Sequence, residues 1–208
     1  LIFLFNGDGH DYEARIESVS AGRTCAVVQD ARLTDHESGL DLTLLQGICR
    51  GQKMDLVIQK ATELGVRAIQ PVSCERSVVR LNPERAQRRR EHWQGVAIGA
   101  AEQCGRSVVP EVRLVENLPA LLADLPPAAT GLLLDPEGDQ PLDDLPAAGT
   151  PIILLAGPEG GLSPAEREAA IDAGFRRVRL GPRILRTETA ALVALSILQY
   201  LHGDLAAR

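Results

Sequence analysis

The most restrictive feature of this sequence is its alternation of apolar strand-like runs with segments of helical periodicity from residue 51 onward. Strand-like runs lie at 66–72, 109–115, 131–136, 151–157 and 175–181, and helical spacing fills most of the intervals between them. Parallel strands need crossover connections, and a helix is the usual one. We therefore expect an α/β fold with a mainly parallel sheet that helices cover on both faces.

Three segments carry clear helix signals. Segment 53–65 ends at Gly65, a typical helix stop, and its apolar face holds Met54, Val57, Ile58, Ala61 and Leu64. Asn82 before Pro83 is typical of a helix start, and the apolar side of that helix holds Trp93, Val96, Ala97, Ala100 and Cys104. The last helix, which ends at Gly203, is apolar nearly all round, so we expect burial on several sides, as in a subunit interface.

The first 45 residues have a different pattern. Short strand-like runs at 1–5, 12–19, 24–33 and 40–47 are separated by turn signals such as NGDG and SAGR. They predict a small β-barrel or sheet. Because the chain begins at Leu1 without methionine, we expect the first strand or two of this barrel to be missing. The predicted domains are residues 1–46 and residues 47–208, with a linker near 45–51.

The charge of the chain is uneven. The net charge is -6, and residues 1–49 hold eight acidic and three basic residues. Residues 76–106 instead hold seven arginines and three acidic residues, and residues 175–187 hold five arginines and no acidic residue. A local basic surface can attract a polyanion despite an acidic total.

The four cysteines have no CxxC spacing and no histidine cluster beside them, so we expect no metal site and no disulfide framework. Reduced cysteines fit a cytoplasmic protein. The apolar runs are too short for a transmembrane helix, so no membrane association is expected.

A glycine-rich turn lies in LLAGPEGGLSPAERE, residues 154–168. Ser163, Pro164 and Glu166 predict a helix start with a capping box after this turn. Ligands favour the carboxyl ends of parallel strands. The turn lacks the GxxxxGK[ST] and GxGxxG patterns of phosphate sites, and Glu159 would repel a phosphate. This turn alone leaves open a plain connection without a ligand.

A second turn of similar design lies in LGPRILRTETAALVALSIL, residues 180–198. It again follows a strand with glycine and proline and leads into a helix. Two such turns are expected to face one another across a pocket.

The two turns together resemble the SPOUT superfamily of methyltransferases. With KMDLVIQKATELG, ERSVV and EQCGR, the chain is similar to the family that methylates N3 of a uridine in small-subunit (16S) ribosomal RNA. The resemblance implies a carboxyl-terminal trefoil knot, an amino-terminal RNA-binding barrel of PUA type, and a homodimer. It also implies an S-adenosylmethionine site in the knot and a substrate within the small ribosomal subunit.

The resemblance places the cofactor in the two turns. Glycines permit close backbone approach, leucine and isoleucine side chains can enclose adenine, and a carboxylate suits a sulfonium better than a phosphate. The expected cofactor-binding residues are Leu134, Leu155, Gly157, Pro158, Glu159, Gly160, Gly161, Leu180, Gly181, Ile184, Leu185, Arg186, Thr189 and Ala190. Asp135, which follows a strand, is expected either to contact the ribose or to begin a turn.

Arg186 is the first candidate for catalysis, because a guanidinium can donate to uracil O4 or a phosphate and stabilise charge on the ring. Glu159 or Glu188 can act as general base if burial raises its pKa. For Glu188 the alternative is a carboxylate that the helix dipole favours in a first turn.

The candidate RNA-binding residues are Arg76, Arg80, Arg106 and Arg183, whereas the arginines of ERAQRRRE at 84–91 fit RNA contact or a solvated face equally well. Two alternatives remain open: a SPOUT enzyme with another target, such as a ribose 2′-hydroxyl, and a non-catalytic RNA-binding ribosome-assembly factor.

Overall fold

The chain forms two sheets. The computed structural model describes residues 1–34, 36–79, 81–142 and 149–206. The first sheet is antiparallel, in the order β1 (Ile2–Leu4), β2 (His10–Ser20) and β3 (Arg23–Leu33). The second has the order β10-β8-β9-β4-β5-β6, with β7 also paired to β5, and every strand pair in it is parallel. The predicted parallel α/β sheet is therefore confirmed.

The elements of the second sheet and its helices follow one another along the chain. The strands are β4 (Leu42–Gly47), β5 (Ala68–Ser73), β6 (Glu111–Val112), β7 (Glu116–Asn117), β8 (Thr130–Leu134), β9 (Ile152–Ala156) and β10 (Arg176–Val178). The helices are α1 (Lys53–Glu63), α2 (Pro83–Cys104), α3 (Leu118–Ala123), α4 (Pro164–Asp172) and α5 (Thr187–His202).

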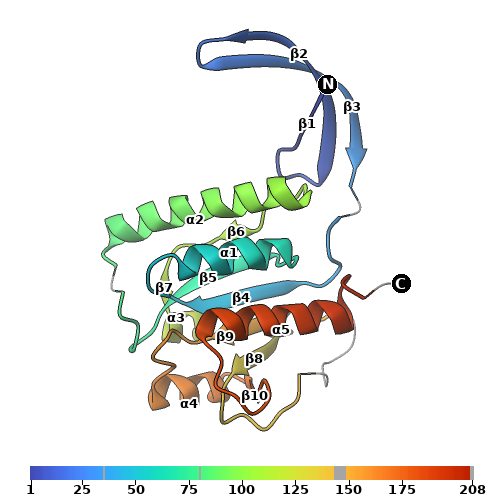
Figure 1. Cartoon of the computed structure of the whole chain (residues 1–208). Helices are drawn as coiled ribbons and strands as arrows, with labels where there is room; N and C mark the ends of the chain where they lie inside the picture. Colours follow the sequence, from blue (N-terminus) through green and yellow to red (C-terminus); the bar gives the residue numbers. More distant parts are fainter. Residues whose placement is uncertain (35, 80, 143–148, 207–208) are drawn as a thin grey trace.

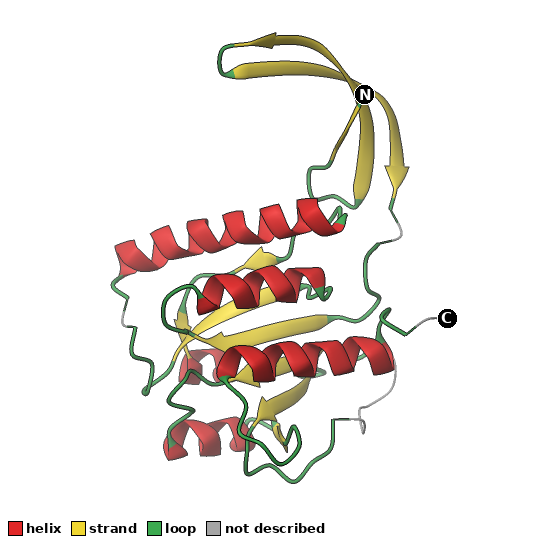
Figure 2. Cartoon of the chain, viewed as in Figure 1, coloured by secondary structure: helices red, strands yellow, loops and turns green. Residues whose placement is uncertain are grey.

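Helices cover both faces of the parallel sheet (Figure 1, Figure 2). Helices α1, α2 and α5 lie on one face, and α3 and α4 lie on the other. Strand β9 shows why the sequence demands this: Leu154 packs into the first core cluster and Leu155 into the second. Successive side chains of a strand point to opposite faces, so a continuously apolar strand needs a helical layer on each side.

The local helix signals are largely confirmed. The Asn82 side chain accepts from the Arg85 amide at the start of α2, and Ser163 and Glu166 form the predicted capping box of α4. Trp93 is buried in the core, as its helical position predicts. Cys104, expected on the same apolar side, is instead exposed at the end of α2.

Strand β4 was predicted as a strand, but grouping it with the amino-terminal strands was wrong. It pairs with β5 and β9 in the middle of the parallel sheet. The sequence of β4 is apolar on both faces, with Leu44 in one core cluster and Leu45 in the other. The boundary between the two sheets therefore falls between β3 and β4.

The antiparallel sheet extends away from the rest of the molecule (Figure 1) and joins it through a short polar contact region. The Gly9 amide donates to the Ser107 carbonyl at 3.2 Å, and the Ser107 hydroxyl donates to Asp11 at 2.6 Å. Nearby, the Arg106 guanidinium donates to Glu37 at 2.7 Å. We call these residues (Gly9, Asp11, Glu37, Arg106 and Ser107) the joint.

Candidate cofactor site

The two glycine turns face the same cavity, of about 470 Å³, at the carboxyl ends of β8, β9 and β10. The first turn follows β9 and leads into α4, and the second follows β10 and leads into α5. Gly161 and Gly181 both have positive φ, of 67° and 72°. A side chain would strain the backbone at either position, so glycine is the residue that permits these turns.

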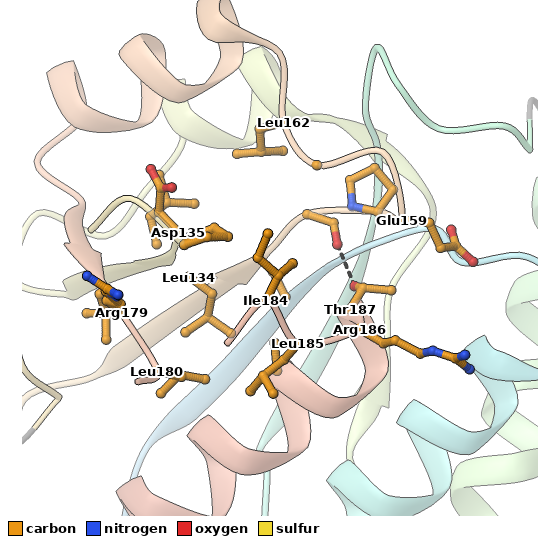
Figure 3. A pocket seen from close by; sticks show the side chains of 18 of the residues that line it. Leu134, Asp135, Glu159, Leu162, Arg179, Leu180, Ile184, Leu185, Arg186 and Thr187 are labelled. Carbon is orange, nitrogen blue, oxygen red and sulfur yellow. Dashed lines mark hydrogen bonds between the residues drawn. The ribbon is translucent and has the colours of Figure 1, made fainter. Parts of the chain in front are cut away.

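A chain of hydrogen bonds fastens the second turn to the first. Gln46, fully buried at the end of β4, donates through Nε2 to the Thr187 hydroxyl at 3.0 Å. The Thr187 hydroxyl in turn donates to the Gly157 carbonyl at 2.5 Å, as Figure 3 shows. Gly47 adds a close backbone approach, because a Cβ there would overlap with Pro158 and lie 2.8 Å from the Gly157 carbonyl carbon.

The middle of the cavity is apolar and its ends are charged. Figure 3 shows Leu134, Leu180, Ile184 and Leu185 between two groups of polar side chains. Asp135 and Arg179 lie on one side, and Glu159 and Arg186 lie on the other. A pocket with an apolar interior and a few polar groups is typical of a small-molecule site.

Lys53, the first residue of α1, lies between the two candidate base residues. Its ammonium is 3.5 Å from Glu159 Oε1 and 3.4 Å from Glu188 Oε2. The backbone amide of Arg50 also donates to Glu159 Oε1, at 2.9 Å. One cation thus joins the first glycine turn to the first turn of α5.

The electrostatic surroundings of Glu159 oppose the role of general base. Desolvation alone would raise the pKa of its carboxyl, but hydrogen bonds from the Arg50 amide and from its own amide, together with Lys53, outweigh that effect and lower the pKa. The raised pKa that this role required is therefore absent, and this prediction is corrected. Glu188 is buried in the first turn of α5, where the helix dipole also favours a carboxylate.

Asp135 is engaged by neighbouring groups. Its side chain accepts from Arg177 Nε at 2.8 Å and from the Glu137 amide at 2.9 Å, and Arg167 Nε lies 3.3 Å away. Asp135 therefore begins a turn, which was one of the two expectations for it. It also lines the cavity.

The cavity brings together most of the predicted cofactor residues. The cavity lining includes Leu134, Gly157, Pro158, Glu159, Gly160, Gly161, Leu180, Gly181, Ile184, Leu185, Arg186 and Ala190. Leu155 does not line it, and its side chain is instead fully buried in the second core cluster. Thr189 and Glu188 are also absent from the lining.

Sequence reasoning missed Lys53, Thr187, Arg179 and Gln46. Gln46 comes from β4 and Lys53 from α1, both more than a hundred residues before the turns, so no local spacing connects them with the site. Thr187 lay within the second motif, and its position at the start of a helix was the signal that could have identified it.

The predicted RNA-binding arginines have different surroundings. Arg183 lines the cavity, and Arg76 is exposed, with Nη1 3.4 Å from the Gly160 carbonyl. Arg80 lies outside the described residues. Arg106 is only 6% exposed and donates to Glu37 and to the Thr62 and Val66 carbonyls. The prediction for Arg106 is corrected, because its guanidinium is used in the joint.

Other chemistries have little support among the described residues. No group of three or more histidine, cysteine, aspartate or glutamate side chains there is arranged to hold a metal ion. Burial raises the pKa of both the Cys49 and the Cys74 thiols to about 12, so they are protonated at neutral pH. Within the part of the chain that is described, no helix is long and apolar enough to cross a membrane.

The fold and the cavity agree with a known class of enzymes. A family model described as "RNA methyltransferase domain" matches residues 36–199. The chain therefore belongs to the RNA methyltransferase domain family.

Individual proteins similar to this chain are more specific than the family model. The chain is 34% identical to the ribosomal RNA small subunit methyltransferase E of Bacillus subtilis, over 98% of this chain and 84% of that protein. It is also similar to a crystal structure of a ribosomal RNA small subunit methyltransferase E from Neisseria gonorrhoeae bound to S-adenosyl methionine. The TM-score is 0.92 and the identity 40%, over 99% of this chain and 84% of that one. A putative methyltransferase from Legionella pneumophila, in complex with the same cofactor, has a TM-score of 0.93 and 38% identity, over 98% and 84% of the two chains.

Proposed function

We propose that this protein transfers a methyl group from S-adenosylmethionine to N3 of a uridine in 16S ribosomal RNA. The observation that carries the proposal is the cavity between the two glycine turns, with an apolar middle and both carboxylates and cations at its ends. The relatives described above, named as small-subunit ribosomal RNA methyltransferases, support the substrate. Two structures similar to this one hold S-adenosylmethionine.

The residues of the cavity fit this cofactor. The volume of about 470 Å³ lies within the range of small-molecule sites. Leu134, Leu180 and Leu185 offer apolar contact for an adenine ring, and the glycines leave backbone groups accessible. The bound cofactor supplies an electrophilic methyl group, so this chemistry needs no metal.

Arg186 is the residue we propose for charge stabilisation. Its side chain is exposed at the cavity and forms no ion pair among the described residues. A free guanidinium can donate to an oxygen of the uracil ring and stabilise the negative charge that develops as N3 loses its proton.

Glu188 remains the candidate base, and Lys53 the group that positions it. The Glu188 side chain is 11% exposed and 3.4 Å from Lys53 Nζ. Lys53 Nζ therefore holds the Glu188 carboxylate in place at the start of α5. Glu159 then has a structural role, as the link between Lys53 and the Arg50 amide.

We also propose the architecture that the resemblance implies: a trefoil knot, a partial PUA-like RNA-binding domain at the amino terminus, and a cytoplasmic homodimer acting on the small ribosomal subunit. The hydrogen bond from Thr187 to Gly157 supports the knot, because it fastens the last segment beside the earlier turn. Exposed Val193, Tyr200 and Leu201 on α5 support an interface there.

Substituting Arg186 by alanine tests the catalytic proposal. We expect R186A to lose methyl transfer by about a hundredfold or more and to bind S-adenosylmethionine within about threefold of the wild type. Methylation is measured on 16S ribosomal RNA and on small subunits, with mass mapping of the modified base, and binding by calorimetry. R67A, at an exposed arginine before β5, is the matched control. Turnover retained in R186A would contradict the role.

The same measurements separate the two alternatives. Mass mapping distinguishes a methyl group on N3 from one on a ribose 2′-hydroxyl. A wild-type chain that binds RNA but shows no calorimetric binding of S-adenosylmethionine would instead be a non-catalytic RNA-binding factor.

A further inference from the structure

A second cavity lies outside the cofactor site, between the segment after β5 and the first half of α2. It measures about 670 Å³ and has two unlike sides. Val78, Val79 and Leu81 form an aliphatic side, and Arg85, Arg88 and Arg89 of α2 form a basic side. His92 also lines the cavity, and its Nε2 lies 2.9 Å from Asp55 Oδ2. We call this cavity the α2 groove.

The arginines of the α2 groove have no acidic ion-pair partners among the residues that the structure describes. Arg85, Arg88 and Arg89 are exposed, and none forms an ion pair within the described residues. Some exposed arginines elsewhere form ion pairs, such as Arg67 with Asp41 and Arg113 with Glu111, whereas others, such as Arg186 at the cofactor cavity, form none among the described residues.

The arginine side chains of this basic side make no polar contact that stabilises the fold among the described residues. Residues three and four positions apart on a helix are neighbours, so Arg85 repels both Arg88 and Arg89, while Glu84 lies four positions before Arg88. The adjacent Arg90 has a structural use, because its Nε donates to the Val112 carbonyl at 3.0 Å. The three outer arginines therefore favour an anionic ligand that would relieve their repulsion.

The α2 groove is connected to the cofactor site by a well-fixed segment. The Glu75 amide donates to Glu166 Oε1 at 2.8 Å, which fastens this segment to the start of α4. At Gly160, in the first glycine turn, a Cβ would lie 3.1 Å from Arg76 Cβ.

We propose that the α2 groove holds the single RNA strand that flanks the target nucleotide, with phosphates at Arg85, Arg88 and Arg89 and a ribose or base against Val78 and Leu81. This inference rests on the proposed function and assigns a surface to its substrate. Arg76 lies between the groove and the cofactor site, so that basic side chains extend from one to the other.

The character of the groove favours single-stranded RNA over other anions. Small anions do not need an aliphatic wall, whereas a nucleotide strand presents phosphates together with apolar sugar and base surfaces. Val78 is 54% exposed, so the aliphatic side is accessible. The chain as a whole repels polyanions at its net charge of -6, which makes a local basic groove the more important for binding.

The test is the salt dependence of RNA binding by the full chain. Filter binding of a 16S ribosomal RNA transcript is measured from about 50 to about 200 mM salt. We expect R85Q/R88Q/R89Q to reduce the slope of log K against log salt by about 2, and R88Q alone by about 0.7, because each lost phosphate contact on a single strand contributes about 0.7. Affinity near the upper salt concentration should fall about tenfold or more in the triple variant.

Two controls keep the test specific. R67Q removes another exposed arginine, at the opposite end of β5 and paired with Asp41, and should leave the slope unchanged. The triple variant should bind S-adenosylmethionine within about twofold of the wild type. It should also unfold at the same or a slightly higher temperature, because glutamine is a comparable helix former and the repulsion is removed.

Each outcome decides the proposal. A folded triple variant with wild-type slope and affinity overturns it, as does an equal loss in R67Q. An aliphatic-side variant, V78N, should lower RNA affinity without changing the slope. If the wild type methylates no RNA, the proposed function fails, but loss of RNA binding in the triple variant would still support the groove.

Discussion

The antiparallel sheet and the parallel sheet are both built from residues with strong strand preference, yet their surroundings are opposite. Among the described residues of β1, β2 and β3, only Ala14 is buried, and Val19, Val28 and Leu33 are more than half exposed. Every residue of β9 is buried. Strand preference therefore forms both sheets, but only the second has helices to cover it.

The buried parallel sheet therefore supplies the stability of the molecule, whereas the exposed antiparallel sheet contributes little apolar burial. The parallel sheet and its helices hold the core clusters and the cofactor cavity. The antiparallel sheet depends on the joint, where polar contacts take the place of a shared apolar core. Substitutions that act on one sheet and not the other make this comparison testable.

The largest effect is expected at Arg106, the buried cation of the joint. R106M leaves Glu37 without its cation and the Thr62 and Val66 carbonyls without donors. We expect a loss of about 3–5 kcal/mol in the free energy of unfolding. Denaturant unfolding measures that loss, and limited proteolysis should cut the antiparallel sheet earlier than in the wild type.

The control at the joint is R106K, which keeps the charge but not the planar group that reaches both carbonyls. It should fall between R106M and the wild type. If R106M unfolds like the wild type, the joint does not hold the two sheets together.

An intermediate effect is expected from a pair of glycine substitutions, one in each region. G47A brings a methyl group against Pro158 and Gly157, and should cost about 1–3 kcal/mol and weaken S-adenosylmethionine binding. G22A lies in an open hairpin turn at φ 78°, with no atom near its Cβ. It should cost about 1 kcal/mol and leave cofactor binding unchanged.

Calorimetry and thermal unfolding of both variants check this pair. Equal losses of cofactor affinity in G47A and G22A would show that the two regions are not independent.

The smallest effect is expected at Lys53 and depends on pH. Because the Glu159 pKa is lowered from its ordinary value of 4.5, its contribution to stability is present above that value and disappears as pH falls through the lowered pKa. K53M removes one of the groups that lower it, so the contribution should disappear at a higher pH. The change should stay below about 1 kcal/mol, since Glu159 is partly exposed.

Thermal midpoints of the wild type, K53M, E159Q and K53M/E159Q between about pH 3 and pH 7 measure this effect. The difference that E159Q makes should vanish at higher pH in the K53M background. Identical pH profiles in both backgrounds would refute the link between Lys53 and Glu159.

The comparison also shows where prediction from sequence succeeded. The capping box of Ser163 and Glu166, the cap at Asn82 and the strand–turn–helix order of both motifs depend on residues close in the chain. Their geometry is fixed by local hydrogen bonds and allowed dihedral angles, so the sequence was sufficient. The resemblance carried by the two turn motifs implied a cofactor site there, and most of the residues it implied line the cavity.

Prediction failed where a residue's partner lies far away in the chain. The sequence by itself determined the alternation of strands and helices, the two glycine turns and the absence of phosphate-binding patterns in them. Only the tertiary structure decided that β4 joins the parallel sheet, that Arg106 is buried against Glu37, and that Lys53 lies between Glu159 and Glu188. The physical reason is that burial and charge pairing depend on which surfaces meet after folding, and local sequence does not specify that.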